Sequence, residues 1–321
     1  MLRTGTSAGA PTGTLDWTLW DIAVPSPSCR LPEISMAGFR PRVPALADIA
    51  MIPHPSVTLL FDLSDGADLV HDAGGRYGRG SVAVGLLPGD FRASGQVGEV
   101  LQIRLQPVAA AALLGEQADL RGEAVSLQDV WGRDVAQAEE RLRAAGSWDE
   151  RFTAARNILL RRLAELTRLD TRPQVDREVA HAWRRTRGSR GRVRVAGLAD
   201  EVGWSRKRLS ARFRSQLGIT PKRAARLVRF DHAAHLLAAG RTAVGAAAES
   251  GYVDQPHLHR EVKEFTGLTP AAVATAPWLA IDDVAWPASP PPARCPSGPD
   301  PGRTAHRGAP ALTLCGAPCE G

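Results

Sequence analysis

Cysteine and long apolar runs are scarce in this sequence, and each scarcity argues against a class of protein. The four cysteines are scattered among 321 residues, so neither a disulfide framework nor a zinc knuckle is indicated; they are Cys29, Cys295, Cys315 and Cys319. No segment approaches the roughly 18–20 apolar residues of a membrane-spanning helix, and no charged-then-apolar signal peptide opens the chain. We therefore expect a cytoplasmic protein without a membrane partner, a metal or another cofactor.

Lysine is also rare: the only lysines are Lys207, Lys222 and Lys263, and all the other Lys and Arg positions are arginine. Charge is distributed unevenly along the chain. Residues 172–275 contain 20 basic and 9 acidic side chains, whereas the rest of the chain contains 20 basic and 25 acidic ones. A basic segment in an otherwise acidic chain is the electrostatic footprint of a nucleic-acid-binding domain. The length leaves room for about two domains.

The N-terminal half is predicted to form a sheet followed by helices. Residues 1–16 are rich in Gly, Thr, Ala and Pro and are expected to be disordered. Apolar or alternating segments bounded by turn residues predict strands of a small antiparallel sheet or barrel at 57–63, 81–87 and 99–105. Helices are expected at 108–114 and 134–145, and a capping box of Ser147 and Glu150 begins a third helix that ends near Leu169. We assign residues 17–170 to this domain.

Residues 171–175, which include Pro173, are expected to link this domain to a second one at residues 176–276. Apolar periodicity, capping residues and glycine stops predict helices at 176–186, 195–202, 205–217, 221–239, 243–250 and 255–265. The segment 287–321 is rich in Pro, Ala and Gly, and we expect an unstructured tail there.

The same supersecondary unit occurs twice in the second domain. In the copy at 251–270, Gly251 suits a left-handed turn and Asp254 is an N-cap, while the apolar stripe consists of Leu258, Val262 and Phe265. The copy at 203–221 repeats this pattern 49 positions earlier with Leu209, Phe213, Gly218, Thr220 and Pro221. A helix, a glycine turn and a capped second helix make a helix-turn-helix, and repetition at a fixed offset predicts two such units.

The outward faces of the two second helices are the predicted DNA-binding surfaces. In the first unit this face comprises Arg206, Lys207, Arg208, Ser210, Ala211 and Arg214. In the second unit it comprises Gln255, Pro256, His257, His259, Arg260 and Lys263. A major groove admits one helix, and Arg, Lys, Gln and His can donate to base edges or phosphates there. The connecting helix adds candidate phosphate contacts at Lys222, Arg223 and Arg226. An equal alternative is that these residues only solvate an exposed face of the helix.

These segments closely resemble the DNA-binding domain of AraC/XylS-type transcriptional regulators. The resemblance covers residues 176–273 and rests on G-W-S-R-K-R-L-S-A-R-F-R-S-Q-L-G-I-T-P from Gly203, R-x-D-x-A-x-x-L-L-A-A-G from Arg229, and G-Y-V-D-Q-P-H-L-H-R-E-V-K-E-F-T-G-L-T-P from Gly251. It implies that the base-reading positions fall on Lys207, Ser210 and Ala211 in the first unit, and on Gln255, Pro256 and Arg260 in the second.

Some residues depart from the pattern of that family. Ala211 stands where the family often has a polar base-reading side chain, so we expect the second helix, with Arg260, to discriminate more strongly between sequences. Val262 and Val273 replace aromatic residues but stay apolar, so the core should be kept. The N-terminal half resembles the sensor-type domain of some of these regulators, notably in V-T-L-L-F-D-L from Val57, which implies effector binding or dimerisation.

The predicted fold class is therefore α+β, with a small mixed sheet-and-helix sensor-type domain followed by an all-α domain of two helix-turn-helix units joined by a connector helix. The predicted function is sequence-specific transcription regulation, with two recognition helices in successive major grooves about 34 Å apart. Double-stranded DNA is the expected partner. RNA polymerase and an unidentified small-molecule effector are further candidates.

Two alternatives belong to other classes of protein. A metal-dependent enzyme would use His232 and His235, or His257 and His259, but no Glu or Cys completes a known ligand spacing around them. His54 and His71 in the sheet region would suggest a cupin-like metal site, but the H-x-H cluster of such a site is absent. A ligand-binding or oligomerisation protein could carry an incidental basic domain, and it would then show no salt-dependent affinity for DNA. A sigma subunit of RNA polymerase is disfavoured by the duplicated units.

Overall fold

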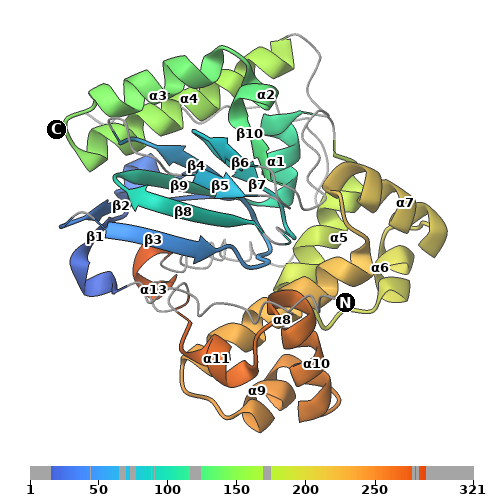
Figure 1. The fold of residues 1–321 in the computed structure, drawn as a ribbon. Helices are drawn as coiled ribbons and strands as arrows, with labels where there is room; N and C mark the ends of the chain where they lie inside the picture. The colour runs from blue at the N-terminus through green and yellow to red at the C-terminus, as the bar shows by residue number, and fades with distance from the viewer. Residues whose placement is uncertain are drawn as a thin grey trace, which may run out of the picture. The chain divides into compact units, whose positions relative to one another are not determined.

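The computed structural model describes residues 16–43, 45–64, 70–72, 77–87, 89, 91–115, 124–168, 175–276, 279 and 282–286. All of them belong to one unit of the chain, Met1–Pro287. The predictions for residues 1–15, for the tail 287–321 and for most of the linker concern residues outside this set. The described parts comprise an N-terminal half of sheets and helices and a C-terminal half of helices (Figure 1), which confirms the α+β class.

The strand pairs of the described residues are antiparallel and form two sheets. The larger sheet has the order β1-β2-β9-β4-β7-β10, formed by Trp20–Ala23, Ile34–Pro41, Val100–Leu105, Val57–Asp62, Val82–Val84 and Ala124–Ser126. The smaller sheet has the order β3-β8-β5-β6, formed by Ala45–Ala50, Arg92–Val97, Val70–Asp72 and Tyr77–Arg79. The three predicted strands are confirmed as β4, β7 and β9. The sheets are nevertheless more extensive than the small one expected.

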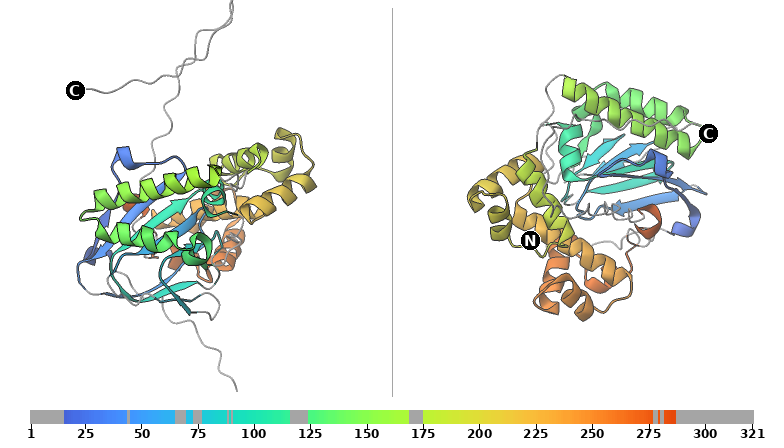
Figure 2. Two further views of the ribbon diagram at one scale, coloured as in Figure 1. Left: turned by 90° about the horizontal axis from the view of Figure 1, so that it is seen from above. Right: turned by 180° about the vertical axis from the view of Figure 1, so that it is seen from behind.

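Short and long helices complete the N-terminal half. They are the 3-10 turns η1 Trp17–Leu19 and η2 Pro27–Cys29, and the helices α1 Pro107–Leu114, α2 Leu127–Trp131, α3 Asp134–Ala144 and α4 Trp148–Arg168. Both α3 and α4 lie across one face of the larger sheet (Figures 1 and 2), where Phe152 and Leu159 of α4 join the core. At the start of α4, Ser147 Oγ accepts from the Glu150 backbone N–H at 3.3 Å. The Glu150 carboxylate accepts from Gly146, one residue before the expected capping-box position.

The C-terminal half contains the six predicted helices, each within two residues of its expected bounds. They are α5 Arg177–Gly188, α6 Val195–Glu201, α7 Arg206–Leu217, α8 Pro221–Ala238, α9 Ala243–Ser250 and α10 Gln255–Thr266, followed by α11 Pro270–Ala274 and α13 Asp282–Ala285. The α6–α7 and α9–α10 pairs lie toward opposite ends of α8 (Figure 1). The sequence predicted no element in the segment that contains α13.

One cluster of buried apolar side chains extends from the larger sheet into the C-terminal helices. Trp183 of α5 takes part in it, and its ring centroid lies 6.5 Å from that of Phe213 in α7. The Trp183 indole N–H donates to the side chain of Gln106, immediately before α1, at 3.2 Å. The first helix-turn-helix unit is thus packed against the N-terminal half.

Candidate nucleic-acid interface

The second helix-turn-helix unit is fixed by the caps that its sequence predicts. Asp254 accepts from the backbone N–H of His257 at 2.7 Å and so caps α10. Gly251 (φ 76°) ends α9 in the left-handed region, and a Cβ there would come within 2.9 Å of Arg192. Gly251 therefore serves both a positive φ and a close approach.

The first unit repeats this local chemistry. Ser205 Oγ accepts from the Arg208 backbone N–H at 3.2 Å, and Gly218 (φ 79°) ends α7 in the left-handed region. Thr220 caps α8 by accepting from the Arg223 backbone N–H at 3.3 Å. The inward side chains Leu209 and Phe213 are fully buried, which orients the opposite face of α7 toward solvent.

The predicted DNA-binding face of α7 is exposed. Its exposed members are Arg206, Lys207, Arg208, Ala211 and Arg214, and Ser210 is half-buried. The Arg208 guanidinium lies 4.3 Å from the centre of the Trp204 ring, a cation–π contact that restricts its orientation. Arg212, on the flank of the helix, instead pairs with Asp176 at 2.7 Å.

The predicted face of α10 is also presented to solvent, but some of its side chains contact one another. Pro256, His259, Arg260 and Lys263 are exposed, whereas Gln255 and His257 are half-buried. The Gln255 amide nitrogen lies 3.2 Å from His259 Nε2, and the Arg260 Nε–H donates to the Pro256 carbonyl at 3.3 Å. These contacts pre-order a polar surface over the first turns of the helix.

The three basic residues at the start of α8 have different surroundings. Lys222 and Arg223 are exposed. Arg226 donates to Glu261 at 2.8 Å and to Glu264 at 2.5 Å, so its guanidinium joins α8 to α10. The sequence prediction made Arg226 a candidate phosphate contact, whereas the structure gives it carboxylate partners within the domain.

Glu261 is a buried charge that the sequence prediction did not single out. Its side chain is only 2% exposed and also accepts from Arg229 at 3.3 Å and from the Tyr252 hydroxyl at 2.8 Å. Burial and the neighbouring carboxylate raise the pKa of Tyr252 above its usual range, so the phenol stays a donor. The network holds α8, α10 and the turn before α10 together.

A groove of about 920 Å³ lies between the two units, bounded by the loop before α6, the first turns of α8 and the outer side of α10. Its basic lining includes Arg192, Arg194, Lys222 and Arg260. The first two residues were not among the predicted contacts. The arginine-rich run at residues 190–194 was the available signal.

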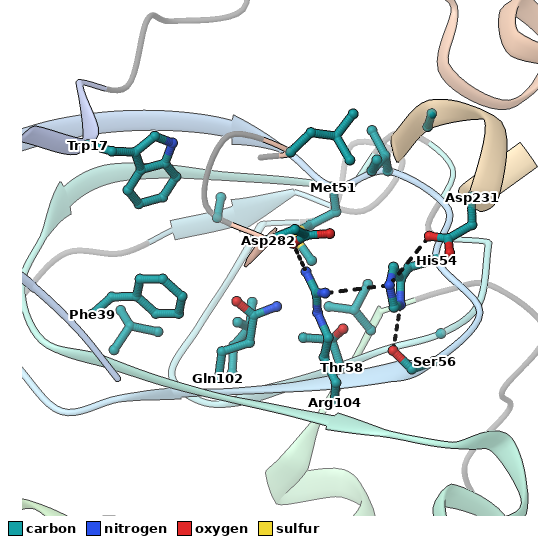
Figure 3. A pocket seen from close by; sticks show the side chains of 18 of the residues that line it. Trp17, Phe39, Met51, His54, Ser56, Thr58, Gln102, Arg104, Asp231 and Asp282 are labelled. Carbon is teal, nitrogen blue, oxygen red and sulfur yellow. Dashed lines mark hydrogen bonds and ion pairs between the residues drawn. The ribbon is translucent and has the colours of Figure 1, made fainter. Parts of the chain in front are cut away.

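A separate pocket of about 140 Å³ lies against the larger sheet (Figure 3). Trp17, Trp20 and Phe39 line its aromatic end. At its polar end are His54, Arg104, Asp231 and Asp282. Because Asp231 belongs to α8, this pocket also borders the helix that joins the two helix-turn-helix units.

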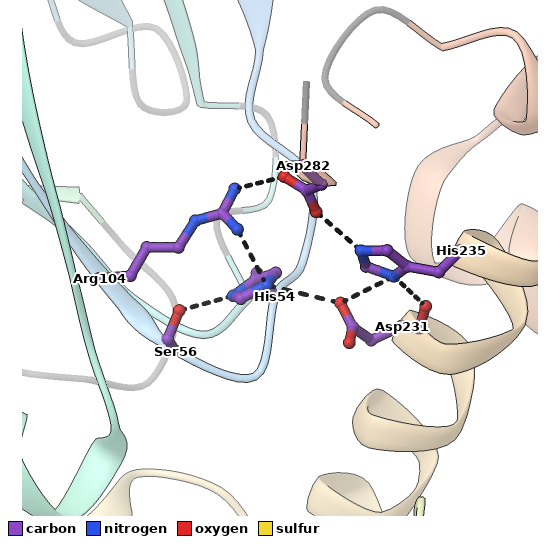
Figure 4. A network of polar contacts seen from close by, with 6 residues as sticks. All are labelled: His54, Ser56, Arg104, Asp231, His235 and Asp282. Carbon is purple, nitrogen blue, oxygen red and sulfur yellow. Dashed lines mark hydrogen bonds and ion pairs between the residues drawn. The ribbon is translucent and has the colours of Figure 1, made fainter. Parts of the chain in front are cut away.

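The polar end of this pocket is a network of ion pairs (Figure 4). Arg104 donates to Asp282 at 3.2 Å, and His235 Nε2 lies 2.8 Å from the other oxygen of the same carboxylate. Burial alone would lower the pKa of His235, but the hydrogen bond to Asp282 and the charge of Asp231 raise it to about 9. His235 is therefore a cation at neutral pH.

Burial also affects the pKa values of the remaining members of the network. Burial and the charge of Arg104 hold the pKa of His54 well below its usual value, so its imidazole is neutral. His54 Nδ1 lies 2.6 Å from Ser56 Oγ, and Nε2 lies 3.5 Å from Arg104. Burial raises the pKa of Asp231. For Asp282, the hydrogen bond from His235 and the charge of Arg104 outweigh burial and lower the pKa.

Two of the histidines considered as metal ligands, His54 and His235, lie instead in the ion-pair network with Asp231 and Asp282. No group of three or more His, Cys, Asp or Glu side chains suited to a metal ion occurs among the described residues. In the same parts of the chain, no helix has both the length and the hydrophobicity that crossing a bilayer requires.

Residues 198–276 match the family model described as a helix-turn-helix domain. No curated protein is significantly similar to the chain in sequence. Among solved structures, the C-terminal domain of AraT, a response regulator from Geobacillus stearothermophilus, is 21% identical over 32% of this chain and 87% of that one, with a TM-score of 0.30. ToxT from Vibrio cholerae is 10% identical over 75% of this chain and 98% of that one, with a TM-score of 0.46.

The family match and the two capped units define a DNA-binding domain of the helix-turn-helix class at residues 198–276. Within that class the domain is of the AraC type, as the resemblance of its sequence predicted. The chain is accordingly a DNA-binding transcription regulator.

Proposed function

We propose that this regulator recognises specific DNA sequences by placing α7 and α10 in successive major grooves, under the control of a small molecule bound in the pocket of the N-terminal half. The observation that carries the proposal is the pair of similarly capped helices with exposed, basic outward faces. A rigid connection between two such helices suits reading of two grooves on one side of the duplex.

The surroundings of each side chain suggest a division of roles. Lys207 and Arg260 are exposed on the outward faces and are assigned to base edges, where one good contact discriminates by about 1–3 kcal/mol. Lys222 and Arg223 are assigned to phosphates, together with Arg192 on the basic groove between the units. These groups would orient the domain on the duplex.

The experiment is selection of preferred sequences from random duplexes, followed by affinity measurements on the selected site. Lys207→Ala and Arg260→Ala should each lose about 1–3 kcal/mol of binding free energy and relax the sequence preference. Arg184→Ala is the matched control, because Arg184 is an exposed arginine on α5, outside both units. Unchanged affinity and preference in both test variants would refute the assigned base contacts.

The pocket supports effector control because Phe230, Asp231 and Ala234 of α8 form part of its lining. A molecule that fills the pocket would contact the same helix that spaces the two recognition helices. The test is operator affinity with and without compounds that bind the protein. Effector control is refuted if compounds that occupy the pocket leave that affinity unchanged.

A further inference from the structure

The residues that follow the second helix-turn-helix unit return to the pocket of the N-terminal half. Asp282, the first residue of α13, lines the pocket and is 7% exposed. Ala285 packs with Trp20 and Phe39 at the edge of the larger sheet. The ring of Trp286 lies 4.1 Å from the Arg104 guanidinium. The segment Asp282–Trp286, here called the strap, therefore covers part of the pocket.

The strap is held by one carboxylate between two cations from different halves of the protein. Arg104 extends from β9 of the sheet and His235 from α8, and each contacts one oxygen of Asp282 (Figure 4). Removing this carboxylate would leave the charges of the half-buried Arg104 and His235 uncompensated, which is costly. The pair of cations consequently forms an anion-binding position that Asp282 occupies.

Arg104 can offer more than Asp282 uses. Asp282 accepts from Nη2 of Arg104, whereas the Nε–H of the same guanidinium is buried and has no partner among the described residues. A guanidinium binds a carboxylate best through two parallel N–H donors. A carboxylate that approaches Arg104 from the pocket could therefore bind in a fork that the tethered Asp282 does not form.

The rest of the pocket limits the body of such a ligand. Its volume of about 140 Å³ is close to that of an apolar cavity known to hold benzene, about 150 Å³. The lining beyond the ion pairs is largely apolar, with Trp17, Phe39 and Leu60 among its members. A cationic ligand is disfavoured because basic side chains outnumber acidic ones at the polar end of the pocket. The basic residues are Arg104, His235 and the nearby Arg187, and the acidic ones are Asp231 and Asp282.

We propose that Asp282 is a tethered occupant of the anion position, and that a small aromatic carboxylate takes its place and releases the strap from β9 and α8. This rests on the proposed function only in taking the pocket as the effector site. Release of the strap removes the link that Asp282 makes between the sheet and α8. Ligand binding would in this way reach the helix that joins the two recognition units.

The test compares two probes of the same shape, 3-phenylpropionate and neutral 3-phenylpropanamide, by calorimetry on the full chain. Asp282→Asn removes the internal competitor, so it should bind the carboxylate about tenfold more tightly than the wild type, which corresponds to about 1.4 kcal/mol. Asp283→Asn is the matched control, since Asp283 is exposed on the same short helix. It should bind both probes as the wild type does. Arg104→Gln should lose the preference for the carboxylate over the amide.

Hydrogen exchange supplies the readout of release. In the wild type, the peptide that contains Asp282–Trp286 should exchange faster with 3-phenylpropionate and remain unchanged with the amide. The proposal is overturned if the carboxylate binds neither the wild type nor Asp282→Asn. It is also overturned if Asp282→Asn raises the affinity for both probes equally, or for neither of them. It is also overturned if strap exchange is unchanged or slower with the carboxylate. None of these measurements uses DNA, so they stand or fall separately from the proposed function.

Discussion

Replacement of Glu261 by alanine should destabilise the protein more than any single change on the exposed face of α10. Glu261 is buried between Arg226, Arg229 and the Tyr252 hydroxyl, all of which donate to its carboxylate. Alanine would leave Arg229 without a counter-ion, and the Nε of that arginine is already buried without a hydrogen-bond partner.

The expected size follows from the exposure of each partner. Loss of one member of a buried ion pair costs about 3–5 kcal/mol. Arg226 retains Glu264, and its side chain is 26% exposed, so the lower end of that range applies, about 3 kcal/mol. Glu264 is 48% exposed and contacts only the outer side of Arg226, so Glu264→Ala should cost at most about 1 kcal/mol.

Urea denaturation followed by far-ultraviolet circular dichroism measures both variants. Glu261→Ala should lower the midpoint without changing the slope, which would indicate a loss of stability rather than a change in the denatured state. Equal losses for Glu261→Ala and Glu264→Ala, or a loss under about 1 kcal/mol for Glu261→Ala, would refute the argument that the buried network holds α10.

Further outcomes follow from individual contacts. Asp254→Ala should cost about 1 kcal/mol of stability through the lost cap of α10 and leave the preferred DNA sequence unchanged in a selection experiment. Lys222→Ala should reduce the slope of log affinity against log salt concentration by about 1, and an unchanged slope would exclude a phosphate contact. The pKa of His235 rises from 6.5 to about 9, so the stability from its pairing with Asp282 is complete below pH 6.5 and is lost as pH rises through 9. His235→Gln should flatten the fall of the melting temperature between pH 7 and 10, and an equally steep fall in that variant would contradict the pairing.

The helix-turn-helix units were predictable because their determinants are local. An N-cap such as Asp254, a turn glycine such as Gly251 and an apolar stripe all lie within a few turns of one another in the sequence. The contacts of Arg226 were not predictable from its own helix, because its partners Glu261 and Glu264 come from α10. The sequence did contain one signal of these contacts, because Glu261 is a charged residue next to Val262 on the inward side of α10.

The pocket is assembled from residues that are far apart in the chain. Arg104 and Asp282 are separated by 178 positions, and Asp282 lies in a segment where the sequence predicted no element. The bounds of strand β2 were not predicted, because the prolines of residues 17–55 indicated only short strands and loops there. Its Gly38 weakens the strand pattern, yet a side chain there would collide with the Trp148 ring of α4. That requirement is visible only once the sheet and the helix are packed together.

The continuous core limits which N-terminal half can be combined with the C-terminal helices. Trp183 is 1% exposed, and its indole N–H is satisfied by Gln106 from the other half of the chain. A fragment severed between the halves would lose that acceptor from the face of α5. Another N-terminal half could replace this one only if it supplied a hydrogen-bond acceptor for Trp183 and a matching apolar surface for α5. The two halves can be told apart in sequence, but they are not interchangeable parts.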